Sequence, residues 1–317
     1  MKKDIIYSLS SPYRDDFRVT GYRFGSAERG MESGKTCCIT GSLRGNEIQQ
    51  LYMCARLIRE LAELERRGEM AHDCEILVIP SLNSYSTNIS KRFWCLDNTD
   101  LNRSFPGSAD GETTERIAAG VFAEIKKYRY GVQFASFYIP GVFIPHVRMM
   151  KTDTENTSLA NLFGLPYVVI RTPSSLDQTT LNYNWQRSGT SAFSVYTNAT
   201  EDIDEASAQL GVSAVLRFLS RMGMIRYRCH GGYMGSIISE DDMLSIMCGA
   251  AGIYRPVKSA GDEVEHDELL AQIIHPYEGT VISEIKAPAD GIIFFAHKSP
   301  LVMQNNVLFK MIKRLHK

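Results

Sequence analysis

Long hydrophobic runs, a strong net charge and Cys-x-x-Cys pairs are all missing from this chain of 317 residues. No apolar stretch is as long as a membrane-spanning helix, so we expect no membrane contact. The formal net charge is −1, and such a balance produces no bulk field that would attract nucleic acid. The start of the chain has neither the apolar core nor the cleavage site of a signal peptide, so we expect a cytoplasmic protein.

The seven cysteines are odd in number and scattered, and none of them belongs to a Cys-x-x-Cys pair. This pattern gives no support to a cysteine-based zinc knot and is typical of reduced, mostly buried thiols. The hydrophobic content of 44% and the charged content of 22% are ordinary for a soluble globular protein. A chain of this length has room for two domains, or for one large domain with an appendage.

The N-terminal part of the sequence alternates between apolar runs and amphipathic stretches. Residues 35–43 and 74–80 are apolar and predict two buried strands. Between them, apolar residues recur at helical spacing over residues 48–64 and predict a helix. A further helix over 112–128 and a strand over 132–137 continue the alternation. This order favours an α/β domain with a parallel or mixed sheet.

A last long helix is predicted over residues 203–222, with Asp202 as its cap. After it, the composition and the hydrophobic period of the sequence change. Beyond Gly223, short apolar stretches alternate with turn residues, which is typical of a small all-β domain. We therefore predict a first domain over residues 1–225 and a second over residues 226–317.

Two polar segments lie in connections that follow predicted strands: residues 41–47 directly after the first, and residues 98–107 late in the long connection after the second. In α/β domains, functional sites form where strands end at their carboxyl edge, so both segments are candidate site loops. The first contains the letters GNE and opens the predicted helix. The second belongs to DNTDLNRSFPG at residues 97–107, the most specific motif of the chain.

A third motif, APADG at residues 287–291, lies late in the β-rich tail. In order and spacing, the three motifs resemble the succinylglutamate desuccinylase/aspartoacylase family, relatives of the zinc carboxypeptidases. The resemblance covers nearly the whole chain. It implies a zinc-carboxypeptidase-like α/β/α domain with a mixed sheet, followed by a small all-β barrel of the lipoyl or biotinyl kind.

The resemblance also implies a chemistry. In the family, a His-x-x-Glu pair and a later histidine bind one zinc and leave a position open for water. Zinc lowers the pKa of that water and polarises an amide carbonyl, while a separate glutamate moves protons. An Asn-Arg pair holds a substrate carboxylate, for which the forked guanidinium is well suited.

Five positions of this sequence match that pattern. Glu47 matches the ligand glutamate, Asn102 and Arg103 match the carboxylate-binding pair, and Arg92 matches a polar position of the same loop. Arg148 lies in a segment that resembles one after the last ligand, and it is a candidate second anion contact. These arginines either converge on an anion pocket, or Arg103 braces the fold.

Three positions depart from the pattern, and all of them are metal-ligand or general-base positions in the family. Arg44 stands at the first histidine ligand, Ala135 at the second, and Tyr196 at the general base. Neither a guanidinium nor a methyl group offers a lone pair to a metal. Losing two of three protein ligands removes tight zinc binding, and we predict that an ion pair between Arg44 and Glu47 replaces the metal.

A substitute metal site would need other ligands near Glu47. None of the candidates has ligand spacing with Glu47 in the sequence; they are Cys37, His72, Cys95, His146 and His230.

The leading functional hypothesis is therefore a pseudoenzyme without a cofactor. It would bind a small carboxylate-bearing ligand, form a homo-oligomer or support an active paralogue, and contact neither nucleic acid nor a membrane. The alternative is an active metal-dependent deacylase that cleaves the amide of an N-acyl amino acid, with zinc held by Glu47 and an unorthodox ligand set. A third hypothesis makes Tyr196 the acid/base and Arg44 an oxyanion stabiliser.

Overall fold

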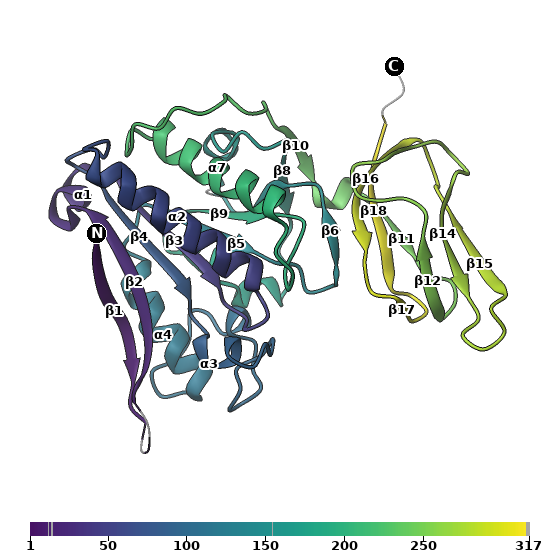
Figure 1. The fold of residues 1–317 in the computed structure, drawn as a ribbon, viewed down its shortest axis with the longest axis horizontal. Coiled ribbons are helices and arrows are strands. Elements are labelled where there is room, and N and C mark those ends of the chain that lie inside the picture. Colours follow the sequence, from purple (N-terminus) through teal and green to yellow (C-terminus); the bar gives the residue numbers. More distant parts are fainter. Residues whose placement is uncertain (12, 14, 154, 315–317) are drawn as a thin grey trace. The chain divides into compact units, whose positions relative to one another are not determined.

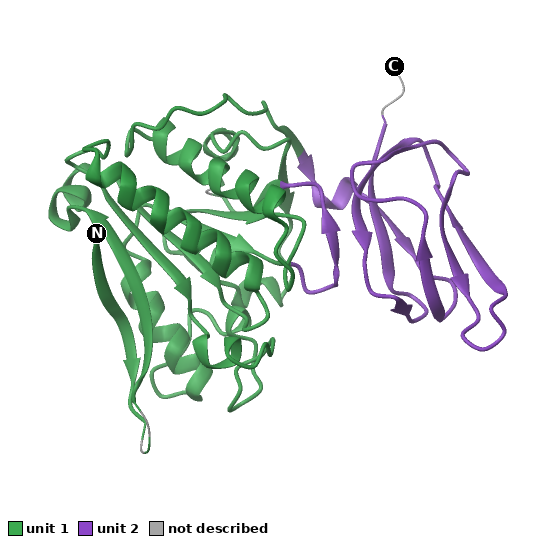
Figure 2. Ribbon diagram, viewed as in Figure 1, with its two compact units in different colours: residues 1–136, 146–237 green, residues 137–145, 238–317 purple. Residues whose placement is uncertain are grey.

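The computed structural model describes residues 1–11, 13, 15–153 and 155–314. The chain divides into two compact units, shown in Figure 2. Unit 1 comprises Met1–Ser136 and His146–Ile237, and unit 2 comprises Phe137–Pro145 and Ile238–Lys317. The division differs from the predicted one at residue 225 because the chain stays with unit 1 beyond that point, where the Ser236 amide donates to the Pro166 carbonyl at 2.9 Å.

Unit 1 is built on a nine-stranded mixed sheet with the order β1-β2-β4-β3-β5-β9-β7-β8-β10. Its central strands β4, β3, β5 and β9 are parallel, whereas β1 and β2 pair antiparallel with their neighbours. Strand β7 is antiparallel to β9 and parallel to β8. The strands are β1 (Lys2–Leu9), β2 (Phe17–Gly25), β3 (Thr36–Ser42), β4 (Glu75–Ser81), β5 (Tyr130–Ala135), β7 (His146–Met150), β8 (Tyr167–Arg171), β9 (Ser191–Tyr196) and β10 (Ser236–Ser239).

Helices cover both faces of this sheet (Figure 1). Successive strand residues point to opposite faces, so Cys37 packs in the core under α2 and α7, and Cys38 in the core under α4 and α6. The helices are α1 (Ala27–Ser33), α2 (Ile48–Arg66), α3 (Ser84–Thr87), α4 (Thr113–Ile125), α5 (Thr157–Asn161), α6 (Leu181–Arg187) and α7 (Glu205–Arg221), with 3-10 turns η1 (Leu101–Arg103) and η2 (Asp177–Thr179).

The predicted elements of unit 1 are present with small shifts of their ends, as β3, α2, β4, α4 and β5. The predicted cap of the last helix is wrong. The structure places Asp204 there, and its carboxylate accepts hydrogen bonds from the amides of Ala206 at 3.1 Å and Ser207 at 3.4 Å. Asp202 lies outside the helix because the first helical residue is Glu205. The N-terminal hairpin β1–β2 was not predicted.

Unit 2 consists of two antiparallel sheets around a core that includes Leu270, Ile293 and Phe309. One sheet has the order β11-β18-β16-β13 with β6 added beside β16, and the other has the order β15-β14-β12-β17. A small β domain was predicted; its lipoyl- or biotinyl-like barrel character stays a prediction. The elements are β6 (Gly141–Phe143), η3 (Glu240–Asp242), β11 (Leu244–Met247), β12 (Gly252–Pro256), β13 (Glu263–Val264), β14 (Leu269–Ile274), β15 (Val281–Lys286), β16 (Gly291–His297), β17 (Leu301–Val302) and β18 (Val307–Lys313).

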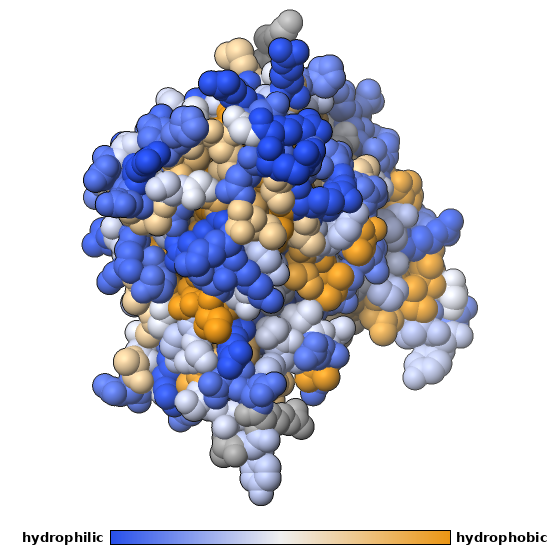
Figure 3. All heavy atoms as spheres, turned by 60° about the vertical axis from the view of Figure 1, so that its left-hand side comes forward, coloured by the Kyte–Doolittle hydropathy of each residue, from blue (hydrophilic) through white to orange (hydrophobic). Residues whose placement is uncertain are grey.

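The face of the molecule in Figure 3 is covered mostly by hydrophilic side chains, with apolar residues in small patches. Within the described residues, none of the helices is both long and apolar enough to cross a bilayer.

One edge of the large sheet brings the predicted site residues together. The parallel strands β3, β5 and β9 all end there, and the antiparallel strand β7 begins there. In the register of the sheet, Tyr196 lies between Ala135 on one side and His146 on the other. This is the edge at which α/β domains place their functional sites.

Candidate functional site

The turn between β3 and α2 holds a buried ion pair. Arg44 is 3% exposed and Glu47 is 0% exposed. Nη1 of Arg44 lies 3.2 Å from Oε1 of Glu47, so the predicted ion pair is present. The turn is tight, because a Cβ at Gly45 would lie 2.3 Å from the Lys91 carbonyl oxygen, and only glycine fits.

Both carboxylate oxygens of Glu47 are occupied by donors from the protein. Oε2 accepts from the backbone amides of Leu43 at 2.8 Å and of Arg44 at 3.0 Å. Oε1 accepts from the hydroxyl of Ser136 as well as from the Arg44 guanidinium. Donors of the protein therefore satisfy the Glu47 carboxylate without any further cation.

Arg44 has a second acidic partner, Asp100, which the sequence analysis did not assign to it. Nε of Arg44 lies 3.0 Å from each carboxylate oxygen of Asp100, and Nη2 lies 3.0 Å from Oδ2. Burial by itself lowers the pKa of the Arg44 guanidinium, but Glu47 and Asp100 raise it above its ordinary value. Arg44 is thus a fixed cation between two carboxylates.

The loop over residues 97–107 is held by its own carboxylates. The Asp97 carboxylate accepts from the backbone amide of Thr114 at 3.0 Å and from the Thr114 hydroxyl, at the start of α4. Although burial raises the pKa of Asp97, the hydrogen bonds from Thr114 bring it below its ordinary value. Asp100 accepts from the Asn102 amide at 3.0 Å and caps η1.

The Asn102-Arg103 pair contacts the segment over residues 176–181. Oδ1 of Asn102 accepts from the Leu181 amide at 3.3 Å. Nη1 of Arg103 donates to the Leu176 carbonyl and lies 3.9 Å from Oδ1 of Asp177. A bracing role of Arg103 is therefore visible, while 25% of its side chain remains exposed.

Arg92 lies within electrostatic range of this group. Its backbone carbonyl accepts from the Gly45 amide at 3.3 Å. Burial lowers the pKa of the Arg92 guanidinium, and the nearby charges of Arg44 and Arg103 lower it further. Three of the four predicted arginines thus gather around Glu47 and Asp100.

The fourth, Arg148, lies beside Tyr196. The Arg148 guanidinium carbon is 4.5 Å from the centroid of the Tyr196 ring, and Arg148 is buried. The His146 ring stacks on the same tyrosine with a centroid distance of 4.9 Å and an interplanar angle of 1°. Cation–π contact and stacking hold the tyrosine ring in place at the end of β9.

A row of buried polar side chains crosses the sheet two residues before the Ala135–Tyr196 pair at this edge. Thr40, Gln133, Ser194 and Arg148 are paired in register on β3, β5, β9 and β7, and all are buried. Nδ2 of Asn182 on α6 donates to the Ser194 hydroxyl at 3.0 Å. Sequence reasoning missed this row; its signal was a polar residue at the same alternating position of several apolar strands.

The residues at this edge do not fit the zinc site of the resembled family. Arg44 and Ala135 provide no lone pair, and the Glu47 oxygens are already bonded to protein donors. Among the described residues, no three His, Cys, Asp or Glu side chains are grouped as a metal site requires. The predicted substitutes include Cys37, which is buried with its thiol pKa raised by burial, and none of them joins Glu47 in such a group.

Residues 33–221 match the model of the succinylglutamate desuccinylase/aspartoacylase catalytic domain. The chain belongs to this family. Its members are deacylases, and the matched range begins before β3 and ends with α7, so it includes every site element described above.

The N-alpha-acetyl-L-2,4-diaminobutyric acid deacetylase of Halomonas elongata is 31% identical over 85 residues, which are 27% of this chain and 23% of that protein. The chain thus matches less than a quarter of the length of this curated relative.

Solved structures of the family share the fold along nearly the whole chain. The succinylglutamate desuccinylase of Silicibacter sp. TM1040 superposes with a TM-score of 0.81 at 17% identity, covering 97% of this chain and 93% of that one. The product-bound ectoine utilization protein EutE (DoeB) of Ruegeria pomeroyi gives 0.78 at 17% identity, with 98% and 95% covered.

Proposed function

We propose that this chain is a metal-independent member of the family that binds a small carboxylate-bearing ligand and does not hydrolyse an amide through zinc. The observation that carries the proposal is the arrangement around Glu47. The carboxylate that would ligate the metal accepts four hydrogen bonds from the protein, and the residue at the first histidine position supplies one of them through its guanidinium.

Charge balance supports the same conclusion. Arg44 provides a permanent positive charge between the two carboxylates of Glu47 and Asp100. A metal ion on Glu47 would have to displace the guanidinium from that carboxylate, and the buried Arg44 would then lose one of its two acidic partners. Leaving a buried charge without its partner costs several kcal/mol, about 3–5 in measured cases.

The arginines beside this group support an anionic ligand. Arg92 and Arg103 lie close to Arg44, and Arg148 lies on the neighbouring strand against Tyr196. A carboxylate pairs with a guanidinium through two parallel hydrogen bonds, which makes arginine the preferred residue for such ligands. Support of an active paralogue is a second form of the same proposal.

The direct test is a metal analysis of protein purified without chelator, together with binding and turnover of a panel of N-acyl amino acids. We expect no stoichiometric zinc, micromolar to millimolar binding of some panel members, and no hydrolysis with or without added zinc. Stoichiometric zinc that disappears in Glu47→Gln, accompanied by amide hydrolysis, would overturn the proposal.

The alternative is an active metal-dependent deacylase, which the local 31% identity to a deacetylase favours. It requires zinc bound through Glu47 and an unorthodox set of ligands. Its distinguishing result is hydrolysis of an N-acyl amino acid that a chelator abolishes and zinc restores. The third hypothesis needs Arg44 to turn toward a substrate oxyanion, whereas both of its acidic partners hold it in place.

A further inference from the structure

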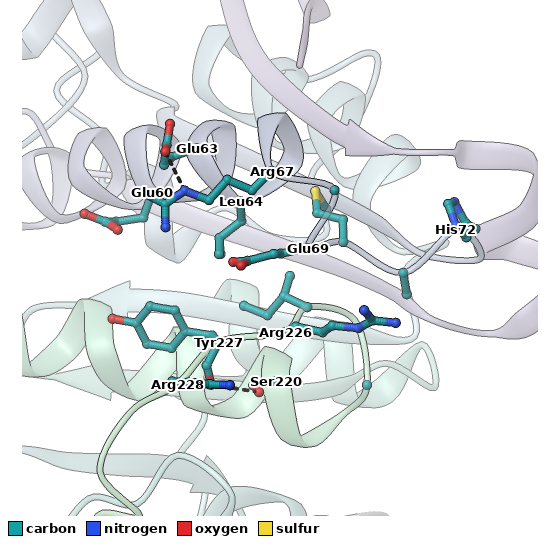
Figure 4. Close-up of a pocket in the computed structure, with 15 residues that line it drawn as sticks. Glu60, Glu63, Leu64, Arg67, Glu69, His72, Ser220, Arg226, Tyr227 and Arg228 are labelled. Carbon is teal, nitrogen blue, oxygen red and sulfur yellow. Dashed lines mark hydrogen bonds and ion pairs between the residues drawn. The ribbon is translucent and has the colours of Figure 1, made fainter.

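Unit 1 contains a pocket of about 1040 Å³ far from Arg44, between the ends of α2 and α7 (Figure 4). The first residue of α2 that lines the pocket is Glu60, about 20 Å along the helix from Glu47 at 1.5 Å per residue. The pocket is within the size range of small-molecule sites, and it plays no part in the function proposed above.

Backbone hydrogen bonds join the two segments that line the pocket after α2 and α7. The segments that follow the two helices form a β-bridge between Met70 and Ile225. The Ala71 amide donates to the Met224 carbonyl at 2.9 Å, and the Arg226 amide donates to the Glu69 carbonyl at 2.7 Å. The walls of the pocket therefore exist before any ligand arrives.

Within the α2 wall, one set of charges is already neutralised. Glu63 accepts from Arg66 through Nε at 2.9 Å and Nη2 at 2.7 Å, and from Nε of Arg67 at 2.6 Å. The hydrogen bonds from Arg66, followed by those from Arg67, lower the pKa of Glu63 to about 2. Glu63 and Arg67 thus satisfy one another and leave Glu60 and Glu69 as the acidic groups of this wall.

The opposite wall is basic. Figure 4 shows Glu60 and Glu69 on the α2 side, and Arg226 and Arg228 on the segment that follows α7. Within the part of the chain that the structure describes, none of these four side chains has an ion-pair partner, and none pairs across the pocket. Tyr227, between Arg226 and Arg228 in the sequence, is half-buried, and burial and then Glu60 raise the pKa of its hydroxyl, so it keeps its proton.

Two sets of opposite charges without ion-pair partners, on segments that the backbone ties together, match a molecule that carries both charges. An ammonium group would be attracted to Glu60 and Glu69, where the carbonyl end of α2 adds further negative potential. A carboxylate would pair with the guanidinium of Arg226 or Arg228. A ligand with one charge alone would satisfy one wall and leave the other unpaired.

We propose that this pocket binds a small zwitterion of the size of an amino acid or short peptide, with its ammonium toward Glu60 and Glu69 and its carboxylate toward Arg226 and Arg228. The site is independent of the carboxylate-binding function proposed for the Arg44 edge of the sheet. The two can therefore fail separately.

The test is calorimetric titration of the full chain with three probes that share a backbone. Triglycine carries both charges, N-acetyl-triglycine carries only the carboxylate, and triglycine amide carries only the ammonium. We expect triglycine to bind and each singly charged probe to bind at least about 10-fold more weakly. Equal affinity for all three probes, or no heat with triglycine at millimolar concentration, would overturn the proposal.

Variants locate the binding. Glu69→Gln and Arg226→Gln are each expected to weaken triglycine binding about 10-fold or more, because each removes one charged partner. The matched controls Glu32→Gln and Arg59→Gln change the net charge equally at exposed positions outside the pocket and are expected to change nothing. Loss of triglycine binding in Arg148→Gln but not in Arg226→Gln would assign it to the other edge of the sheet and refute this site.

Discussion

The charged side chains at the two ends of α2 differ in whether they form ion pairs. At its N-terminal end, the buried Arg44 forms ion pairs with the buried Glu47 and the partly buried Asp100 at 3.0–3.2 Å. At its C-terminal end, Glu69 and Arg226 face one pocket without pairing. Burial explains the difference, because a charge removed from water must find a partner, whereas a hydrated charge at a surface gains little from one. The buried ion pair at one end and the unpaired charges at the other follow from the same rule.

The largest change is expected from rebuilding the metal-ligand set at the buried end. Arg44→His with Ala135→His places two imidazoles beside Glu47, and three protein ligands are what a catalytic zinc site contains. We expect this double variant to hold stoichiometric zinc, measured by elemental analysis after desalting. The control is Ala135→His alone, which keeps the guanidinium and should remain without zinc. A double variant that binds none would show that Ala135 does not stand at the second ligand position.

Removing the buried guanidinium without replacing it is the next test. Arg44→Met leaves the buried Glu47 and the partly buried Asp100 without their cation, and we expect a loss of about 3–5 kcal/mol in the free energy of unfolding. Urea denaturation followed by circular dichroism measures it. Arg59→Met, on the exposed face of α2, is the matched control and is expected to change stability by less than about 0.5 kcal/mol. Equal effects of the two substitutions would contradict the role given to Arg44.

The arginine of the Asn-Arg pair tests ligand binding beside the buried ion pair. Arg103→Ala is expected to weaken binding of N-acetylglycine by about 1.5–3 kcal/mol, the value of a hydrogen bond to a charged group. Calorimetric titration measures it. Because Arg103 also contacts Leu176, the control is Arg171→Ala, which loosens the same segment by removing a partner of Asp177. Equal weakening by both variants would mean that Arg103 only braces the fold.

The pH dependence of stability tests the segment that contacts Arg103. Burial raises the pKa of Asp177, but hydrogen bonds from Ser174 and the charge of Arg171 bring it below its ordinary value. The folded state therefore favours the carboxylate, so its stabilisation is full above about pH 4. It is lost as the pH falls through the lowered value. We expect Asp177→Asn to cost about 1–2 kcal/mol at pH 7 and progressively less in urea titrations below pH 4. A constant difference from pH 7 to pH 2 would contradict this assignment.

The smallest effect is expected at the exposed end of α2. Glu69→Gln with Arg226→Gln should leave the free energy of unfolding within about 0.5 kcal/mol of the unaltered protein, because neither side chain has an ion-pair partner in the described part of the chain. Thermal denaturation without ligand measures it. A large loss would show that these charges stabilise the fold, and the contrast between the two ends of α2 would disappear.

Local patterns predicted the central elements and the Arg44–Glu47 ion pair. The helical spacing over residues 48–64 predicted α2, and the three-residue separation of Arg44 and Glu47 predicted their ion pair. The Arg44–Asp100 contact joins residues 56 apart, so it depends on the path of a loop that no local pattern specifies. The cap of α7 was misplaced because Asp202 and Asp204 carry the same side chain near one helix start, and only the backbone distinguishes them.

Residues 137–145 interrupt unit 1 and belong to unit 2, so the two units are linked by more than one crossing of the chain. Between Ser136, which donates to Glu47, and His146, which stacks on Tyr196, the polypeptide contributes β6 to the sheet of unit 2, where it pairs with β16. A chain shortened at residue 237 would keep this strand and lose its pairing partner. We expect the Ser136 hydroxyl beside Glu47 and the His146 ring beside Tyr196 to become less firmly held, so that a C-terminal truncation would destabilise the first unit as well as the second.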